Sequence, residues 1–307
     1  MRYVLGFDGG GTKTECVLMD ESGAILARSR SGASNAVNVG ANAAAAALAE
    51  AGKEALGSVA LCDVAYILAG ISGAGEPAAR AEIQANLKPV FPKATIVVTS
   101  DLILSLAATG EIPSLVVIAG TGSAVLGRTS PFKLARAGGF GPIIGDAGSA
   151  NDIGRKTVAR CFQKFLNKER FLLTDEICRT FNCTWTQFVD LAREQPTVIF
   201  PKVFPIVATA AESGDPSARA ILSMAAASLV EQVREVVDHL QLQHTSFFLA
   251  KTGGVFDASP FLSEQFDSLL GQMARNVRPG PLPRPVAESA AMLARLALTT
   301  PLEMPES

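Results

Sequence analysis

Glycine and hydroxyl side chains are concentrated in one short segment near the start of the chain. The segment reads DGGGTKT and consists of Asp8, Gly9, Gly10, Gly11, Thr12, Lys13 and Thr14. Consecutive glycines are typical of a backbone that must turn tightly or approach another group closely. The backbone N–H groups of such a turn can point at phosphate oxygens, and the two threonine hydroxyls and the lysine can add to the binding. The pattern therefore predicts a phosphate-binding turn.

Asp8 precedes these glycines at the end of a predicted strand. Magnesium in phosphate-transfer sites is usually held by one or two carboxylates together with water and the phosphates of the substrate. We therefore expect Asp8 to take part in binding Mg²⁺. The alternative is an ordinary β-hairpin, since Asp and Gly are standard turn residues. Two residues suffice for such a turn, so three glycines favour a ligand.

A second segment in the middle of the chain repeats this pattern. It reads IAGTGS and contains Gly120, Thr121, Gly122 and Ser123, with hydroxyl groups on alternate residues. A strand–glycine–strand unit differs from the P-loop and from the dinucleotide fingerprint, because both of those lead from a strand into a helix. Two such turns from opposing domains could hold a polyphosphate between them.

Asp101 lies where a predicted strand, TIVVTS, meets a predicted helix, LILSLAATG. Two interpretations of this residue are open. An Asp at such a junction commonly caps the helix, which is worth about 1 kcal/mol. Alternatively, its carboxylate is a general base that accepts a proton from a hydroxyl group.

Two α/β domains must position these residues, because the strand–turn–strand unit occurs twice. In the first half, we expect strands at 2–8, 15–20, 24–32, 63–73 and 94–101 and helices at 41–56, 77–91 and 102–110. In the second half, we expect strands at 114–120, 124–130, 133–139 and 244–250, helices at 145–166, 256–274 and 285–298, and mainly helical structure over 169–250. We expect prolines to break that helical structure at 194–205. The repeat predicts domains of similar topology that face each other across a cleft.

The composition excludes several classes of partner. The 307 residues carry a net charge of −2 without a run of Lys or Arg, so we expect neither a nucleic acid nor a membrane surface as partner. The five cysteines lack a CxxC pair, which indicates reduced thiols rather than a metal site. The sequence shows no signal peptide and no uninterrupted run of about 18 apolar residues. We therefore expect a soluble, cytoplasmic protein.

Four motifs occur in a fixed order along the chain: DGGGTKT, IAGTGS, GGFGPIIGDAGSA and KTGGVF. This ordered set resembles the BadF/BadG/BcrA/BcrD ATPase family and, within it, the N-acetylglucosamine and glucosamine kinases of the actin-like, sugar-kinase and Hsp70 ATPase superfamily. The resemblance implies an α/β protein of two ribonuclease-H-like domains, each with a central mixed sheet, and an ATP cleft between them. The implied domains are residues 1–110, residues 111–285 with a helical insertion, and a C-terminal helix and tail, 286–307, that pack back on the first domain.

The resemblance also implies roles for particular residues. It implies an ATP-dependent kinase that phosphorylates an amino sugar, N-acetylglucosamine or glucosamine, at the 6-hydroxyl, with Mg²⁺ ordered by Asp8. The two glycine turns match the loops that bind the phosphates of ATP, and Gly253 and Gly254 match the turn that contacts adenosine. Asp101 matches the general base. The residues expected to bind the sugar are Asn35, Ser72, Gly138, Gly139 and Asp146.

Some features leave alternatives open. Ala147 stands where these kinases usually have Glu, so a carboxylate that could contact the sugar is missing and the identity of the sugar is open. Asn35 could instead be a loop residue with left-handed backbone, and Ser149 could be a helix cap. A non-catalytic sugar- or nucleotide-binding protein is one alternative function. An ATPase activator of a dehydratase is another, disfavoured because the cysteines do not suit an iron–sulfur cluster. A homodimer is a possible assembly.

Overall fold

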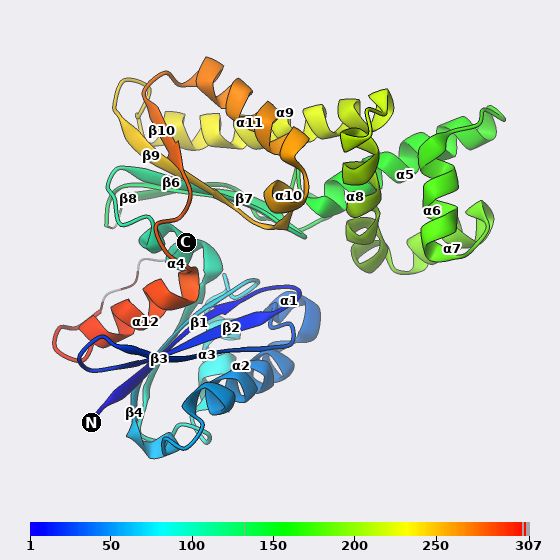
Figure 1. Ribbon diagram of the computed structural model, residues 1–307. Coiled ribbons are helices and arrows are strands. Elements are labelled where there is room, and N and C mark those ends of the chain that lie inside the picture. Colours follow the sequence, from blue (N-terminus) through cyan, green and yellow to red (C-terminus); the bar gives the residue numbers. More distant parts are fainter. Residues whose placement is uncertain (132, 303, 305–307) are drawn as a thin grey trace. The chain divides into compact units, whose positions relative to one another are not determined.

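The computed structural model describes residues 1–131, 133–302 and 304. The chain divides into two compact units. Unit 1 combines Met1–Glu111 with Leu282–Ser307, and unit 2 is the continuous segment Ile112–Pro281. Both ends of the chain therefore contribute to unit 1 (Figure 1).

Unit 1 is built on a mixed sheet of five strands in the order β3-β2-β1-β4-β5. The strands are β1 (Tyr3–Gly9), β2 (Thr14–Asp20), β3 (Ile25–Ser31), β4 (Val64–Ile71) and β5 (Thr95–Ser100). β1, β2 and β3 pair in antiparallel fashion, whereas β1, β4 and β5 run parallel. The first glycine turn joins β1 to β2, so it lies at the carboxyl edge of the parallel strands.

Helices cover both faces of this sheet. They are α1 (Ala36–Val39), α2 (Ala41–Leu56), α3 (Pro77–Leu87), α4 (Asp101–Ala108) and α12 (Val286–Leu296), with a short 3₁₀ helix at Leu61–Asp63. α2 and α3 pack on one face, where Leu5, Phe7 and Ile67 belong to their hydrophobic cluster. α12 packs on the other face, beside the N-terminal strands (Figure 1). Its apolar residues share a hydrophobic cluster with Val4 and Leu104.

Unit 2 repeats the topology of unit 1. Its strands are β6 (Ser114–Ala119), β7 (Ser123–Ser130), β8 (Lys133–Gly138), β9 (Phe247–Thr252) and β10 (Val277–Gly280), in the order β10-β9-β6-β7-β8. β6, β7 and β8 are antiparallel, and β6, β9 and β10 are parallel. The prediction of two α/β units with similar mixed sheets is confirmed. The sequence analysis missed β10, a four-residue edge strand.

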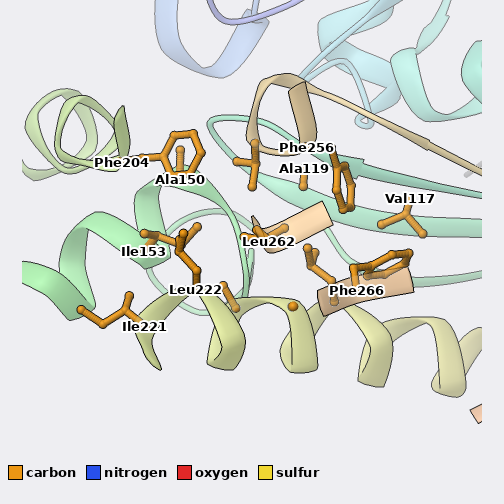
Figure 2. Close-up of a cluster of buried hydrophobic side chains, with 14 of the residues drawn as sticks. Val117, Ala119, Ala150, Ile153, Phe204, Ile221, Leu222, Phe256, Leu262 and Phe266 are labelled. Atoms are coloured by element: carbon orange, nitrogen blue, oxygen red, sulfur yellow. The ribbon is translucent and has the colours of Figure 1, made fainter. Parts of the chain in front are cut away.

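The helices of unit 2 bury the larger hydrophobic core. They are α5 (Ala150–Leu166), α6 (Leu172–Phe181), α7 (Trp185–Glu194), α8 (Pro196–Glu212), α9 (Pro216–His239), α10 (Gly254–Ala258) and α11 (Pro260–Met273). Figure 2 shows part of this core, in which Val117 of β6, Ile153 of α5 and Phe266 of α11 are buried. The predicted helix at 256–274 is divided, because Ser259 ends α10 and caps α11.

The predicted break at 194–205 is confirmed only at its start, because α7 ends at Glu194 and α8 begins at Pro196. α8 is one helix with Pro201 and Pro205 in its interior. A proline inside a helix removes one backbone hydrogen bond and costs about 3 kcal/mol. α8 also buries Ile199, Val203 and Val207, and burial of each such side chain contributes about 1.5–3 kcal/mol. The burial of seven residues of α8 therefore offsets the cost of its two interior prolines.

Candidate functional site

The carboxyl ends of three parallel strands meet at one edge of the sheet in unit 1. Gly9 of β1 pairs with Ile71 of β4, which in turn pairs with Ser100 of β5. Asp8 precedes this row on β1, and Asp101 follows it as the first residue of α4. Ligands of open α/β sheets bind outside the carboxyl ends of parallel strands, so this edge is the natural place for a site.

The two carboxylates at this edge interact electrostatically. Burial, together with the charges of Asp101 and Glu15, raises the pKa of Asp8 to about 7 against the opposing effect of Lys13. Near neutral pH the Asp8 carboxyl is therefore close to half ionised. A divalent cation beside it would favour the ionised form and relieve the repulsion. The pair thus fits the predicted magnesium site.

The N-cap interpretation of Asp101 is wrong. The side chain of Ser100 caps α4, because its Oγ accepts a hydrogen bond of 3.3 Å from the N–H of Ile103. Asp101 has helical backbone, and its Oδ1 accepts a bond of 2.9 Å from the N–H of Leu102. The cap and the candidate base are thus separate residues.

The first glycine turn is held in place by a neighbouring loop. The carbonyl of Gly10 accepts hydrogen bonds of 3.0 Å from the N–H groups of Ser34 and Asn35, and the carbonyl of Gly9 accepts one of 2.8 Å from Ser72. Thr14 is fully buried, and its Oγ1 lies 2.7 Å from Oγ of Ser34. Thr14 therefore shapes the turn from within.

The tip of the same turn is exposed. Gly11, Thr12 and Lys13 are accessible to solvent. The ammonium of Lys13 lies 2.7 Å from the carboxylate of Glu15, which also pairs with Arg30 at 2.9 Å. These cations lower the pKa of Glu15 against the effect of its partial burial. The exposed tip with its adjacent lysine is compatible with an anionic ligand.

Asn35 and Ser72 are brought together beside this turn. The amide nitrogen of Asn35 donates a 3.0 Å hydrogen bond to Oγ of Ser72. Its Oδ1 caps α1 by accepting from the N–H groups of Val37 and Asn38 at 3.0 and 3.1 Å. The φ of Asn35 is −62°, so the left-handed alternative is wrong. The sequence analysis missed Ser34, for which only its neighbour Asn35 gave a signal.

The second glycine turn is joined to the start of α5. The N–H of Ala150 donates to the carbonyl of Gly120 at 2.9 Å, and the N–H of Asn151 donates to that of Thr121 at 3.3 Å. The first N–H groups of a helix have no partner within it, so the turn supplies acceptors for two of them. Ser149 caps α5 by accepting from the N–H of Asp152 at 3.1 Å, which confirms the cap interpretation.

Asp146 lies against this second turn. Its backbone has a φ of +57°, and its side chain is buried. A Cβ added to Gly122 would come within 2.7 Å of Asp146 Oδ2. Asp146 Oδ1 has no hydrogen-bond partner among the described residues. Burial raises the pKa of Asp146, while the N–H groups of Gly141 and Ser123 oppose the shift. A buried acceptor in this state suits a ligand that donates a hydrogen bond.

The remaining predicted residues flank the second turn as well. Gly138 ends β8, and the N–H of Gly139 donates to the carbonyl of Ser123 at 2.8 Å. Gly253 caps α10 with a φ of +109°, and a Cβ added there would come within 2.4 Å of the carbonyl oxygen of Ala119. Gly254 is the first residue of α10. Unit 2 therefore gathers its predicted residues around one turn, as unit 1 does.

Residues 1–131, 133–302 and 304 lack two kinds of feature, a cluster of metal ligands and a membrane-spanning helix. Within these residues no group of three or more His, Cys, Asp or Glu side chains could hold a metal ion. The same part of the chain has no helix that is both long and apolar enough to cross a membrane.

Comparison with solved structures defines the class of fold. The chain resembles a protein from Chromobacterium violaceum, provisionally named an N-acetylglucosamine kinase, with a TM-score of 0.80 and 22% identity over 95% of this chain and 98% of that one. It also resembles a ROK family glucokinase from Streptomyces griseus, solved with glucose and AMPPNP, with a TM-score of 0.58 and 17% identity over 96% and 99% of the two chains. The fold is thus the two-domain α/β fold of these proteins.

The family follows from the sequence. The chain belongs to the BadF/BadG/BcrA/BcrD ATPase family, whose model matches residues 5–294. It is 28% identical to the N-acetylmuramic acid/N-acetylglucosamine kinase of Clostridium acetobutylicum over 88% of this chain and 90% of that protein. It is also 28% identical to the N-acetyl-D-glucosamine kinase of Dictyostelium discoideum over 85% and 87%.

Proposed function

We propose that the protein is an ATP-dependent kinase that phosphorylates an N-acetylated amino sugar, with N-acetylglucosamine as the first substrate to test. Membership of an ATPase family and the names of the two curated relatives support this choice. Fold alone would not support it, because related folds host different activities. The proposal therefore depends on the residues of the site.

The observation that carries the proposal is the pair of carboxylates at the carboxyl edge of the sheet in unit 1. We assign Asp101 as the general base that accepts the proton of the attacking sugar hydroxyl. Asp8 would hold the Mg²⁺ ion through its water shell, and that ion would neutralise charge on the phosphates. The different environments of the two carboxylates support this division, because burial and neighbouring charge raise the pKa of Asp8.

The glycine turns supply the binding groups in this proposal. Phosphoryl transfer depends mainly on positioning and charge stabilisation. The exposed tip at Gly11 and Thr12, with the ammonium of Lys13, would bind phosphate oxygens, as would the turn at Gly120–Gly122. Gly253 and Gly254 would contact adenosine.

The sugar would be bound by Asn35, Ser72, Gly138, Gly139 and Asp146. The Asp146 Oδ1 atom, buried without a partner among the described residues, supports a hydrogen bond from a sugar hydroxyl. We propose the 6-hydroxyl as the acceptor because a primary hydroxyl is the least hindered. Ala147 in place of Glu leaves the preference between N-acetylglucosamine and glucosamine to be measured. We also expect a homodimer, which light scattering during gel filtration would test.

The decisive experiment measures ADP release with a panel of sugars: N-acetylglucosamine, N-acetylmuramic acid, glucosamine and glucose. D101N should lower kcat by about 10²–10⁴-fold, because a general base contributes that much, with the KM for ATP changed less than about twofold. Phosphorus–proton NMR of the product would identify the phosphorylated oxygen.

The matched control is D63N. Asp63 is also in unit 1, but it precedes β4 and so lies at the opposite edge of the same sheet. The kcat of D63N should remain at the wild-type value. Full activity of D101N would refute Asp101 as the general base. Sugar binding without ADP release by the wild type would refute the kinase assignment in favour of a binding protein.

A further inference from the structure

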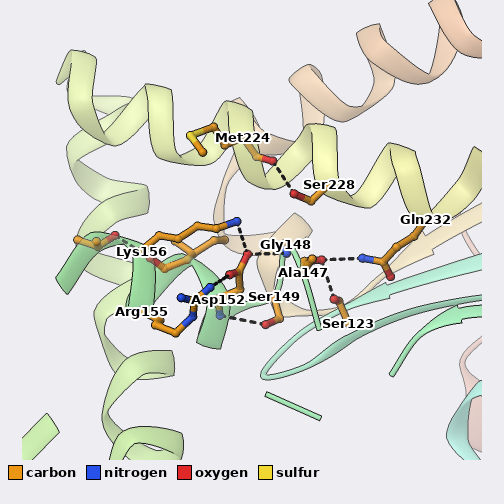
Figure 3. A network of polar contacts seen from close by, with 12 residues as sticks. Ser123, Ala147, Gly148, Ser149, Asp152, Arg155, Lys156, Met224, Ser228 and Gln232 are labelled. Carbon is orange, nitrogen blue, oxygen red and sulfur yellow. Dashed lines mark hydrogen bonds and ion pairs between the residues drawn. The ribbon is translucent and has the colours of Figure 1, made fainter. Parts of the chain in front are cut away.

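The carbonyl of Ala147 accepts two hydrogen bonds from side chains far apart in the sequence. Oγ of Ser123, the first residue of β7, donates at 2.8 Å, and Nε2 of Gln232 in α9 donates at 2.7 Å (Figure 3). A carbonyl oxygen has two lone pairs, so the acceptor capacity of Ala147 is used by these two donors. Ala147 follows Asp146 directly, so the bonds fix the backbone next to the candidate sugar ligand.

The other end of the Gln232 amide touches the opposite end of the same loop. A Cβ added to Gly138 would collide with Oε1 of Gln232, and Gly138 has a φ of +70°. We call residues 139–149 the β8–α5 loop, because they connect β8 to α5. The Gln232 side chain therefore contacts Gly138, directly before this loop, and Ala147 near its end.

The side chains in the middle of this loop are exposed to solvent. Ile143 is 91% exposed and Ile144 is 83% exposed. Asp146, in contrast, is only 7% exposed, and Gln232 is equally buried. Gln232 and Ser123 hold Ala147, directly after Asp146, and the N–H of Ser149 donates to the carbonyl of Asp146 at 3.1 Å. These contacts at the base of the loop help to determine the position of Asp146.

A role in stability alone does not explain a glutamine at this position. Its Oε1 is buried and has no hydrogen-bond partner among the described residues. Burying a polar atom without a partner costs free energy. Gln232 lies between Leu229 and Val233 on the face of α9 that is buried. An apolar side chain of similar size would suit that face better.

We propose that Gln232 is a positioning residue that holds the β8–α5 loop so that the carboxylate of Asp146 can accept a hydrogen bond from the acceptor sugar. The role in sugar binding rests on the proposed kinase function. Gln232 itself touches neither sugar nor nucleotide in this proposal. It acts through the Ala147 carbonyl and through its contact with Gly138.

Two variants of Gln232 test the proposal. Q232M keeps the length of the side chain and removes both polar atoms. Q232L is apolar and of similar volume, and it also cannot donate to Ala147. The matched control is S228A, because Ser228 lies one helical turn earlier on α9 and its Oγ donates only to Met224 of the same helix, at 3.0 Å (Figure 3).

Two measurements separate positioning from stability. Hydrogen exchange followed by mass spectrometry should show faster exchange in peptides covering 138–148 of Q232M, with the rest of unit 2 and S228A unchanged. Steady-state kinetics of Q232M should show a KM for the sugar raised at least tenfold, with the KM for ATP changed less than twofold. We expect the melting temperature of Q232M to equal or exceed that of the wild type, which a merely structural residue would not produce.

These measurements decide whether Gln232 holds the loop, even if the proposed kinase function fails. Unchanged exchange in 138–148 of both variants would overturn it, as would equal rises in both KM values. If Q232M does not fold, Q232L provides the same comparison. If the wild type phosphorylates no sugar, the kinase function fails, whereas the exchange measurement still decides whether Gln232 holds the loop.

Discussion

Asp101 raises the pKa of Asp8 across the carboxyl edge of the β1–β4–β5 sheet, although the two residues belong to a helix and a strand that are distant in the chain. The effect adds to that of burial, which is the larger cause. Two carboxylates that share a site are driven apart in pKa, so one of them ionises less readily. The pair can therefore supply both a ligand for a cation and a proton acceptor at the same edge of the sheet.

The first prediction concerns the stability of D8N. The pKa of Asp8 is about 7 in the folded protein against 3.8 as its ordinary value, so the folded state binds a proton more tightly between these pH values. Stability is therefore lost as the pH rises from about 4 to 7, and the whole penalty is present above pH 7. D8N removes the penalty and should be more stable than the wild type at pH 8 by roughly 1–2 kcal/mol, a value reduced for partial solvent screening.

Melting curves between pH 4 and pH 8 would measure this difference. D20N is the control, and its stability should change in the opposite direction, because a hydrogen bond from Ser22 lowers the pKa of Asp20. D20N should lose stability at neutral pH relative to the wild type. A constant difference between D8N and the wild type across the pH range would contradict the assignment.

The second prediction concerns proton release on binding Mg²⁺–ADP. If a cation binds beside Asp8, the carboxyl must lose its proton, so binding at pH 7 should release on the order of 0.5 proton. Affinity should rise with pH between about 6 and 8. Calorimetry in two buffers of different ionisation enthalpy measures the release, and D8N should abolish it. The absence of release in the wild type would remove Asp8 from the metal site.

The third prediction concerns the packing of the first glycine turn. In G9A, the new Cβ would collide with Oγ of Ser34 and lie 2.6 Å from Cδ1 of Ile71. Overpacking of this kind costs about 1–3 kcal/mol, and the shifted turn should also weaken ADP binding. G32A is the matched control, because a Cβ there meets nothing within 4 Å. Equal ADP affinity in the two variants would show that the turn does not bind the nucleotide.

The fourth prediction separates the cap of α4 from the candidate base. S100A removes the side chain that accepts from Ile103 and should destabilise the protein by about 1 kcal/mol. It should retain most of its kcat, whereas D101N should lose kcat with little change in stability. Denaturant unfolding and steady-state kinetics on both variants check this. The reverse pattern would make Ser100, rather than Asp101, the residue on which turnover depends.

The fifth prediction concerns the prolines inside α8. Pro205 is exposed, so P205A should restore a backbone N–H to the helix interior without a loss of packing. We expect a gain of roughly 1 kcal/mol, less than the full cost of an interior proline because the surrounding helix has adapted to it. P196A, at the first turn, should be close to neutral. A lower melting temperature of P205A than of P196A would contradict this account.

Much of the fold could be predicted because its patterns are local. Apolar strands followed by glycine turns marked the first three strands of each unit, and alanine-rich periodic segments marked the helices. β10 has only four residues, one of them Pro279, and gave no strand signal. α8 was misjudged because its burial depends on packing against α5 and α9, which the sequence of α8 alone cannot show.

The site was harder to predict than the fold. Glycine, Asp8 and Asp101 could be selected because their types and positions at strand ends suit phosphate chemistry. The cap at Ser100 was missed because a strand–helix boundary is uncertain by a residue or more. Gln232 lies outside every motif. The signal that could have found it is a polar residue within the buried stripe of α9, between Leu229 and Val233.

The placement of α12 has a consequence for biosynthesis. One face of the sheet in unit 1, with Val4, Tyr66 and Leu68, is covered by this helix from the other end of the chain. A ribosome therefore finishes all of unit 2 before it supplies the segment that completes unit 1. During that interval the nascent sheet must expose an apolar face, which would make it a ligand for chaperones and a point of vulnerability to premature termination.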